Sequence, residues 1–321
     1  MKRKVPFSNI TAEGWQNLAI FAILIFYLMQ IGADLLWQNT CGHLAIDYCA
    51  FWSAGQVANH HGYSNLYDLE LITKYQMPLF PRQDTFDVIP VPYLAIFILP
   101  FQLLSLLDVA TGFWIWTLIN LVAYVWYLRF FVKAMTSNPL SLRLTFILAL
   151  SLPFFNNLYI GQVNVWFTIC VGEFMRLTMS NRPFRAGVWL GGLLLKPQML
   201  LLILPFLILY RYWKALAGLT AASSVIVGTS FALTGIEGMS SLLRLLFGYV
   251  GGLPTNGPEL MMNWRMIGVN ISWPLAIIGV IVTVLAICYV WWKDKGKLSR
   301  ICLLATIAGT LALSWHSHVA A

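Results

Sequence analysis

The sequence has few charged residues, since Asp, Glu, Lys and Arg make up 10% of its 321 residues while 59% are hydrophobic. A soluble domain carries roughly a quarter charged residues, so this composition excludes an ordinary soluble protein. Several apolar runs reach about 20 residues, the length that crosses a membrane as a helix. Lipid offers no partner for unpaired backbone groups, and the alternating pattern of a membrane barrel is absent. The sequence therefore predicts an all-α polytopic membrane protein.

Cysteine is also scarce. The five cysteines show neither a Cys-x-x-Cys spacing nor a Cys/His pattern typical of zinc, so we expect no metal site of that kind. Cys41 and Cys49 would share the outer side of the membrane, where a disulfide between them is possible. We favour the alternative that they are two unlinked, small apolar residues. Internal repeats are missing too, which removes support for a transporter built on inverted repeats.

Acidic residues are fewer than basic ones: the sequence has 12 Asp and Glu residues and 20 Lys and Arg residues, which gives a net charge of +8. Such a charge can indicate a nucleic-acid partner. Here, however, the basic residues lie in short connections between apolar runs, where they act as topology signals. We therefore expect membrane lipids and no nucleic acid as partners.

The N-terminus predicts an uncleaved first span. Met1-Lys2-Arg3-Lys4 precedes an apolar run from Leu18 to Trp37, which is too long for a signal peptide and has no small-residue cleavage site. The basic end is expected in the cytoplasm, and the protein in the plasma (inner) membrane. Residues 38–90 would then form an outer loop. Amphipathic spacing within that loop predicts two interfacial helices, around residues 48–58 and 67–75.

Two apolar segments do not fit simple crossings. If residues 92–107 and 112–131 both spanned the membrane, Arg129, Lys133 and Arg143 would lie outside, against the positive-inside tendency. The conflict disappears if 92–107, which begins and breaks at prolines, dips in from the outer face and returns. Irregular backbone at that depth is tolerated where it lines a protein cavity.

Lys196-Pro197-Gln198 similarly divides residues 186–210 into two short helices that would meet near the outer leaflet. A second outer loop is expected over residues 235–270. Residues 1–321 would then form a single integral membrane domain of about 8–10 membrane helices. Because the chain stops at a polar outer motif directly after a span, we expect C-terminal spans to be missing.

This threading brings polar groups from separate segments to one side of the membrane. They are Asp47, Gln162, Asn164, Lys196, Asn263, Arg265, His316 and His318. An ionisable residue between apolar runs, such as Lys196, is a functional-site hypothesis by default. The alternative is that Lys196 snorkels or pairs with a carbonyl at the helix break.

A carboxylate beside cations suits the transfer of a sugar from a polyprenyl phosphate. Asp47 would take the proton from the acceptor hydroxyl, and Lys196 with Arg265 would hold the phosphate as the glycosidic bond breaks. Aromatic residues such as Trp52 could offer a ring face to the sugar or the prenyl chain. Packing on the core is an equally good role for them.

A set of motifs now resembles one family. They are Asp47 before Phe51-Trp52-Ser53-Ala54-Gly55, Tyr67-Asp68, Pro90-Val91-Pro92-Tyr93, Gly161-Gln162-Val163-Asn164, Ala186-Gly187 with Lys196-Pro197, and Ser314-Trp315-His316-Ser317-His318. In this order the motifs cover nearly the whole chain. They resemble glycosyltransferase family 87, a group of GT-C membrane enzymes that use polyprenyl-phosphate mannose. One departure is that Val91 splits the proline pair.

The resemblance implies a GT-C-like helical bundle and a hexosyltransferase that needs no metal and no cofactor. Asp47 would be the catalytic base of an outer-face site that the lipid donor enters laterally. His316 and His318 would lie near that site and contact the donor phosphate. Trp52, Tyr67, Gln162 and Asn164 would contact substrate. The transferred hexose is expected to be mannose and the acceptor a lipid or glycan; the alternative is a transporter or flippase for a lipid-linked sugar.

Overall fold

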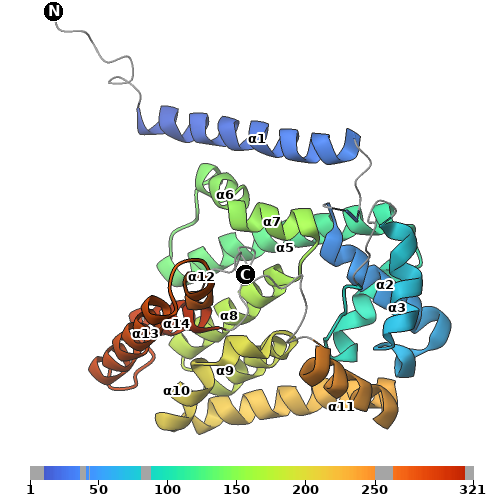
Figure 1. Cartoon of the computed structure of the whole chain (residues 1–321). Helices are drawn as coiled ribbons and strands as arrows, with labels where there is room; N and C mark the ends of the chain where they lie inside the picture. Colours follow the sequence, from blue (N-terminus) through green and yellow to red (C-terminus); the bar gives the residue numbers. More distant parts are fainter. Residues whose placement is uncertain (1–10, 37–40, 43, 81–87, 250–262, 315–321) are drawn as a thin grey trace, which may run out of the picture.

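The structure is a computed structural model and describes residues 11–36, 41–42, 44–80, 88–249 and 263–314. Helices account for the regular structure of these residues (Figure 1). In chain order the α-helices are α1 Ala12–Leu36, α2 Ile46–His61, α3 Leu69–Gln76, α4 Leu99–Leu104, α5 Val109–Thr136, α6 Leu142–Ala149, α7 Leu152–Ile160, α8 Asn164–Met179, α9 Pro183–Leu190, α10 Ile203–Leu209, α11 Trp213–Arg244, α12 Trp264–Asn270, α13 Trp273–Lys293 and α14 Arg300–Leu313.

Four helices, α1, α5, α11 and α13, are long and apolar enough to cross a membrane, and a bent pair would make a fifth span. The exposed side chains of these helices are mostly apolar and therefore suited to contact with lipid. On α13, Ile277, Ile281 and Leu285 follow one another at four-residue intervals and are all exposed, so they form one apolar stripe. The prediction of an all-α polytopic membrane protein is confirmed.

The two segments predicted to be irregular are short helices. The segment Ala95–Leu104 is too short to cross the hydrocarbon core of a membrane, which is roughly 30 Å thick. A segment that enters and leaves on the same face must be shorter than a full span. The other segment breaks at Lys196, whose φ of −132° and ψ of 79° are not helical. One short helical piece therefore ends at Leu195 and the next begins at Pro197.

The segment 142–159 is divided into two helices, α6 and α7, with a bend of 54° between them. Pro153 lies in the first turn of α7. Proline has no N–H to donate and its ring clashes with the carbonyl four residues earlier, so a helix that runs through this point is kinked or broken.

The predicted outer loop 235–270 contains more helix than expected. The helix α11 continues to Arg244, and α12 follows at Trp264–Asn270; residues 250–262 lie outside the described residues. The predicted start of the loop is nevertheless visible as a kink, because Gly235 has a φ of 66°. A positive φ is easily adopted only by glycine, which allows a sharp change of direction here.

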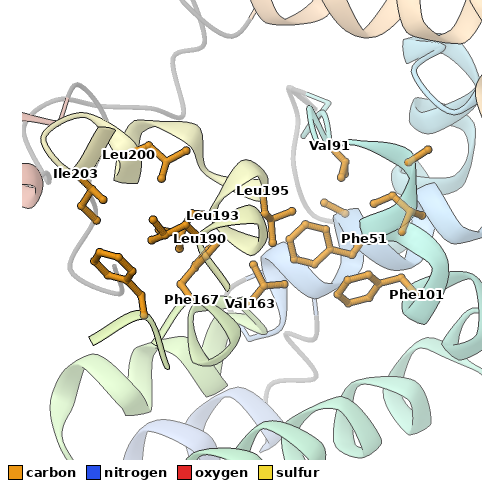
Figure 2. Close-up of a cluster of buried hydrophobic side chains, with 14 of the residues drawn as sticks. Phe51, Val91, Phe101, Val163, Phe167, Leu190, Leu193, Leu195, Leu200 and Ile203 are labelled. Atoms are coloured by element: carbon orange, nitrogen blue, oxygen red, sulfur yellow. The ribbon is translucent and has the colours of Figure 1, made fainter. Parts of the chain in front are cut away.

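Both helices predicted between residues 38 and 90 are present, as α2 and α3. The helix α2 is more buried than an interfacial position would make it. It packs against α3, α4, α5 and α7, and Tyr48, Phe51 and Val57 are at most 3% exposed. Phe51 and Phe101 of α4 join an apolar cluster that continues through Leu195 to Leu193 and Ile203 (Figure 2). The core thus connects α2 to the break at Lys196.

Candidate functional site

Asp47 lies in the first turn of α2 and is partly buried. The chain enters the helix through Ala45, whose φ of 64° is left-handed. The Ala45 N–H donates to the Tyr159 carbonyl at 2.8 Å, which fixes the start of α2 to the end of α7. The partial positive charge of a helix N-terminus favours a carboxylate at this position.

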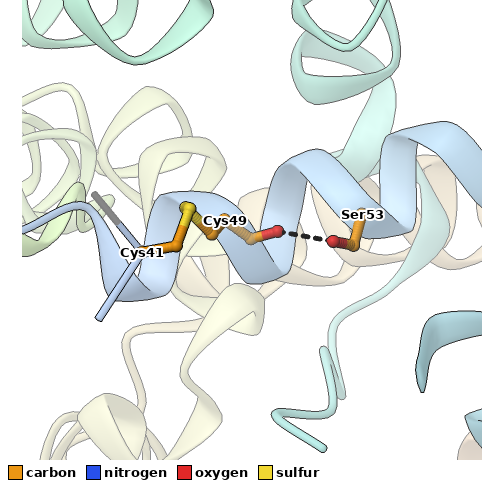
Figure 3. Close-up of a disulfide and its surroundings, with 3 residues drawn as sticks. All are labelled: Cys41, Cys49 and Ser53. Atoms are coloured by element: carbon orange, nitrogen blue, oxygen red, sulfur yellow. Dashed lines mark hydrogen bonds between the residues drawn. A yellow bond between two sulfur atoms is a disulfide. The ribbon is translucent and has the colours of Figure 1, made fainter. Parts of the chain in front are cut away.

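A disulfide joins Cys41 to Cys49 (Figure 3). Asp47 lies between these cysteines in the sequence and so belongs to a short covalent loop. Both cysteines are at most 1% exposed. The preference for two unlinked cysteines was therefore wrong. Sequence spacing alone did not show that the Ala45 turn would fold Cys41 back onto the first turns of α2. The disulfide adds a covalent restraint to the segment that carries Asp47.

We expect the Cys41→Ser, Cys49→Ser double variant to unfold at a lower temperature than the wild type. Closing a loop of this size contributes about 2–3 kcal/mol through the entropy of the unfolded chain. Thermal unfolding in detergent, with and without reductant, measures the loss. Cys288→Ser is the matched control because Cys288 is free and exposed. Equal melting of the double variant and this control would contradict the prediction.

The Gly161–Asn164 turn lies against the start of α2. It is held by Asn157, whose backbone carbonyl accepts from the Gln162 N–H at 2.8 Å and whose Oδ1 accepts from the Asn164 N–H at 3.0 Å. The indole N–H of Trp116 also donates to the Gly161 carbonyl at 3.1 Å. These bonds come from α5 and α7, so the turn is fixed from two sides.

This turn holds the two ionisable groups of the site. The Gln162 side chain donates from Nε2 to Asp47 Oδ2, and Asn164 Oδ1 accepts from Lys196 Nζ at 2.8 Å. Lys196 Nζ also lies 5.3 Å from the centre of the Phe167 ring, a cation–π distance. The side-chain amides of Gln162 and Asn164 thus fix the positions of the Asp47 carboxylate and the Lys196 ammonium.

Asp47 and Lys196 influence each other without direct contact: these two described residues form no ion pair within 4.0 Å. Burial raises the pKa of Asp47, while the Gln162 hydrogen bond and the positive charge of Lys196 oppose that rise. A carboxylate with a raised pKa is a stronger base than an exposed one. The arrangement can accept a proton at Asp47 and bind an anion at Lys196.

Tyr93 is a neighbour that sequence reasoning left without a role. Burial and the nearby Asp47 carboxylate both raise the pKa of its phenol, which therefore stays protonated as a hydrogen-bond donor. Its position after Pro90-Val91-Pro92 was the available signal. Asn157 was missed in the same way, although the Asn156-Asn157 pair marks a polar corner.

Trp52 and Tyr67 make hydrogen bonds inside the protein. The Trp52 indole N–H donates to the Leu107 carbonyl at 3.1 Å, and the Tyr67 hydroxyl donates to the Tyr93 carbonyl at 2.7 Å. These bonds attach the two ends of the segment 93–107 to α2 and to the turn before α3. Tyr67 is buried, whereas Trp52 is only partly buried.

Arg265 and Asn263 belong to a different part of the fold from the start of α2. Arg265 lies on α12, which packs mainly against α13, and Asn263 caps the same helix and donates to the Ser314 carbonyl at 2.8 Å. His316 and His318 lie outside the described residues. Within the described part of the chain, no group of three or more His, Cys, Asp or Glu side chains is arranged to hold a metal ion.

The fold and this geometry define an integral membrane protein with a carboxylate at the start of α2 and an ammonium at a break between short apolar helices. The model of glycosyltransferase family 87 matches residues 91–314, more than half of the chain, which therefore belongs to this family. It is a membrane glycosyltransferase that moves a sugar from a donor to an acceptor. The match includes Gln162, Asn164 and Lys196, while Asp47 precedes it. Neither the curated proteins nor the solved structures gave a match.

Proposed function

We propose that the enzyme transfers a hexose, expected to be mannose, from a polyprenyl-phosphate carrier to a hydroxyl of a lipid or glycan acceptor. The observation that supports this most is that one turn holds Asp47 through Gln162 and Lys196 through Asn164. A base and a cation that are held apart are what acceptor activation and phosphate departure require. The proposed active site is the region between these two side chains.

In the proposed reaction, the acceptor oxygen forms a bond to the anomeric carbon as the bond from that carbon to the donor phosphate breaks. The hydroxyl proton passes to Asp47, and the bonding electrons leave with the phosphate oxygen. Lys196 stabilises the charge that develops there. An ammonium has three donor hydrogens, so the bond to Asn164 leaves two for phosphate. Arg265, His316 and His318 remain proposed as further phosphate contacts. Trp52, Tyr67, Gln162 and Asn164 remain proposed as substrate contacts.

The site is proposed to face the non-cytoplasmic side of the plasma membrane, with the N-terminus in the cytoplasm. The Cys41–Cys49 disulfide supports this orientation because disulfides form and persist in oxidising compartments. The basic residues Arg129, Lys133 and Arg143 support it as well, since positive-inside loops are cytoplasmic.

We expect purified enzyme to transfer labelled mannose from a polyprenyl-phosphate donor to a membrane glycolipid, and to keep this activity in a metal chelator. The ammonium of Lys196 can stabilise the leaving phosphate without a metal ion. Thin-layer chromatography and mass spectrometry of the lipid product measure transfer. A nucleotide sugar and polyprenyl-phosphate glucose are the control donors. Transfer from the nucleotide sugar alone would overturn the donor assignment.

A further inference from the structure

A second charged site lies where α9 and α11 begin. It is a cleft of about 420 Å³ lined by Arg182, Pro183, Phe184, Arg185 and Lys214. The lining comes from two helices that are separated along the chain by α10. Three of its five residues are cations, and none of them belongs to the proposed active site.

The two backbones that carry the cleft are held at a fixed separation because α9 and α11 approach very closely. A Cβ on Gly187 would stand 1.9 Å from the Ala215 carbonyl oxygen, and one on Gly218 would stand 2.0 Å from the Phe184 carbonyl oxygen. Only glycine permits backbones to come this near, as in other contacts of small residues between membrane helices. The spacing of Arg185 and Lys214 is therefore set by the backbone.

The three cations are not neutralised by the described part of the protein. The ion pairs found there are Arg143 with Glu13 and Arg176 with Glu173. No carboxylate of the described residues lies within 4.0 Å of Arg182, Arg185 or Lys214. The cleft is shallow and open, and it concentrates positive charge on one part of the surface, which favours an anionic ligand.

The cleft is far from the proposed active site. The helix α8 runs from Asn164 for 16 residues to Met179, just before the cleft, and this length corresponds to about 24 Å. The segment Pro183–Leu195 then returns to Lys196. With the active site at the outer face, the cleft lies at the cytoplasmic face; this step rests on the orientation in the proposed function.

Large aromatic side chains adjoin the cations. Phe184 is 49% exposed and Trp213, next to Lys214, is 62% exposed. Exposed aromatic rings are typical of the level where lipid headgroups meet acyl chains. A soluble anion needs only the cations, whereas a phospholipid would also cover these rings.

We propose that this cleft binds the phosphate of an anionic phospholipid from the cytoplasmic leaflet. Arg182, Arg185 and Lys214 contact the headgroup phosphate, and Phe184 and Trp213 contact the glycerol and upper acyl region. Basic pockets between membrane helices on this side bind anionic headgroups in the same way. The lipid would hold the ends of α9 and α11, which position Lys196 from the inner face.

Native mass spectrometry of the full chain tests the site, with phosphatidylglycerol and phosphatidylcholine as probes. We expect phosphatidylglycerol to bind preferentially, and the variant Arg182→Gln, Arg185→Gln, Lys214→Gln to bind it at least about tenfold more weakly. The control variant Lys133→Gln, Lys293→Gln, Lys295→Gln removes the same charge from other helix ends and should keep binding. Equal loss in both variants would overturn the site.

Two further arms identify the ligand. Glycerol phosphate should displace phosphatidylglycerol poorly, because it lacks the acyl region; full displacement would show a soluble phosphate site and overturn the lipid assignment. Binding is also measured in Asp47→Asn protein, where it should be unchanged. A failure of sugar transfer and a failure of lipid binding are thereby separate results.

Discussion

Asp47→Asn is expected to lower the turnover number for sugar transfer by about 10²–10⁴-fold, the usual contribution of a general base. Asparagine keeps the size of the side chain and can still pair with Gln162, but it cannot accept the acceptor's proton. The donor phosphate is held by other groups, so donor binding should remain close to that of the wild type. Initial rates with labelled donor and equilibrium donor binding measure the two effects separately.

The pH dependence of wild-type activity provides a second test of the role of Asp47. The base must be ionised, so activity rises with pH as Asp47 loses its proton. Burial raises the pKa of this carboxyl, which places the acid limb of the profile above that of an ordinary carboxylate. Gln162→Met removes a hydrogen bond that lowers the pKa, and should move the limb to still higher pH.

Asp108→Asn is the matched control for Asp47→Asn. Asp108 is exposed and caps α5 by accepting from the Thr111 N–H at 3.0 Å, a bond that asparagine also makes. This variant should keep both its fold and its rate. If Asp47→Asn turned over at the control rate, Asp47 would not be the base, and the acid limb would have to come from another group.

The features of the fold that could be predicted from the sequence are those that depend on the residues at a single point of the chain. Prolines and polar residues inside apolar runs indicated the short segment Ala95–Leu104 and the break at Lys196, because a break in a helix leaves a mark in the residues at that point. The bend between α6 and α7 has such a mark at Pro153. It was missed because a proline in a first turn is compatible with both an uninterrupted start and a bend.

The pairings across the site could not be predicted. Asp47 and Gln162 are 115 residues apart in the sequence, and no periodicity links them. Their contact depends on how α2 packs against the end of α7, which is a property of the whole core. The same is true of the disulfide, where Cys41 is brought back to Cys49 by the left-handed turn at Ala45. The sequence predicted Gln162 and Asn164 as substrate contacts, but it did not show that they hold Asp47 and Lys196.

Gly161→Ala is expected to lower both stability and turnover strongly, because it disturbs the turn that holds both ionisable groups. Gly161 has a φ of 78°, and its added Cβ would stand 2.4 Å from Tyr48 Cβ and 3.2 Å from the Tyr48 backbone. Rotation of the Tyr48 side chain cannot relieve these contacts, since Cβ and the backbone do not move with it. Relief requires a shift of α2 next to Asp47.

The strain alone costs about 1–2 kcal/mol for a left-handed alanine, so the clash should bring the loss of unfolding free energy above that. Two variants separate these contributions. Gly235→Ala meets nothing within 4 Å, and at a φ of 66° and a ψ of −171° it should show only backbone strain, about 1–3 kcal/mol for a conformation that is essentially restricted to glycine. Gly228→Ala also meets nothing within 4 Å, has no positive φ, and should be stabilising by about 0.5–1 kcal/mol.

The turnover number distinguishes a change in the position of Asp47 from a general loss of protein stability. Gly235→Ala should retain the wild-type turnover number below its melting temperature, because the added Cβ meets no atom within 4 Å and so displaces no neighbour. Gly161→Ala should lose turnover at the same temperature, with the acid limb of its pH profile displaced as the Gln162 bond to Asp47 is strained. If the two variants had equal stability and equal turnover, the turn would not set the position of the base, and Asp47 would depend for its position on the start of α2 and the disulfide alone.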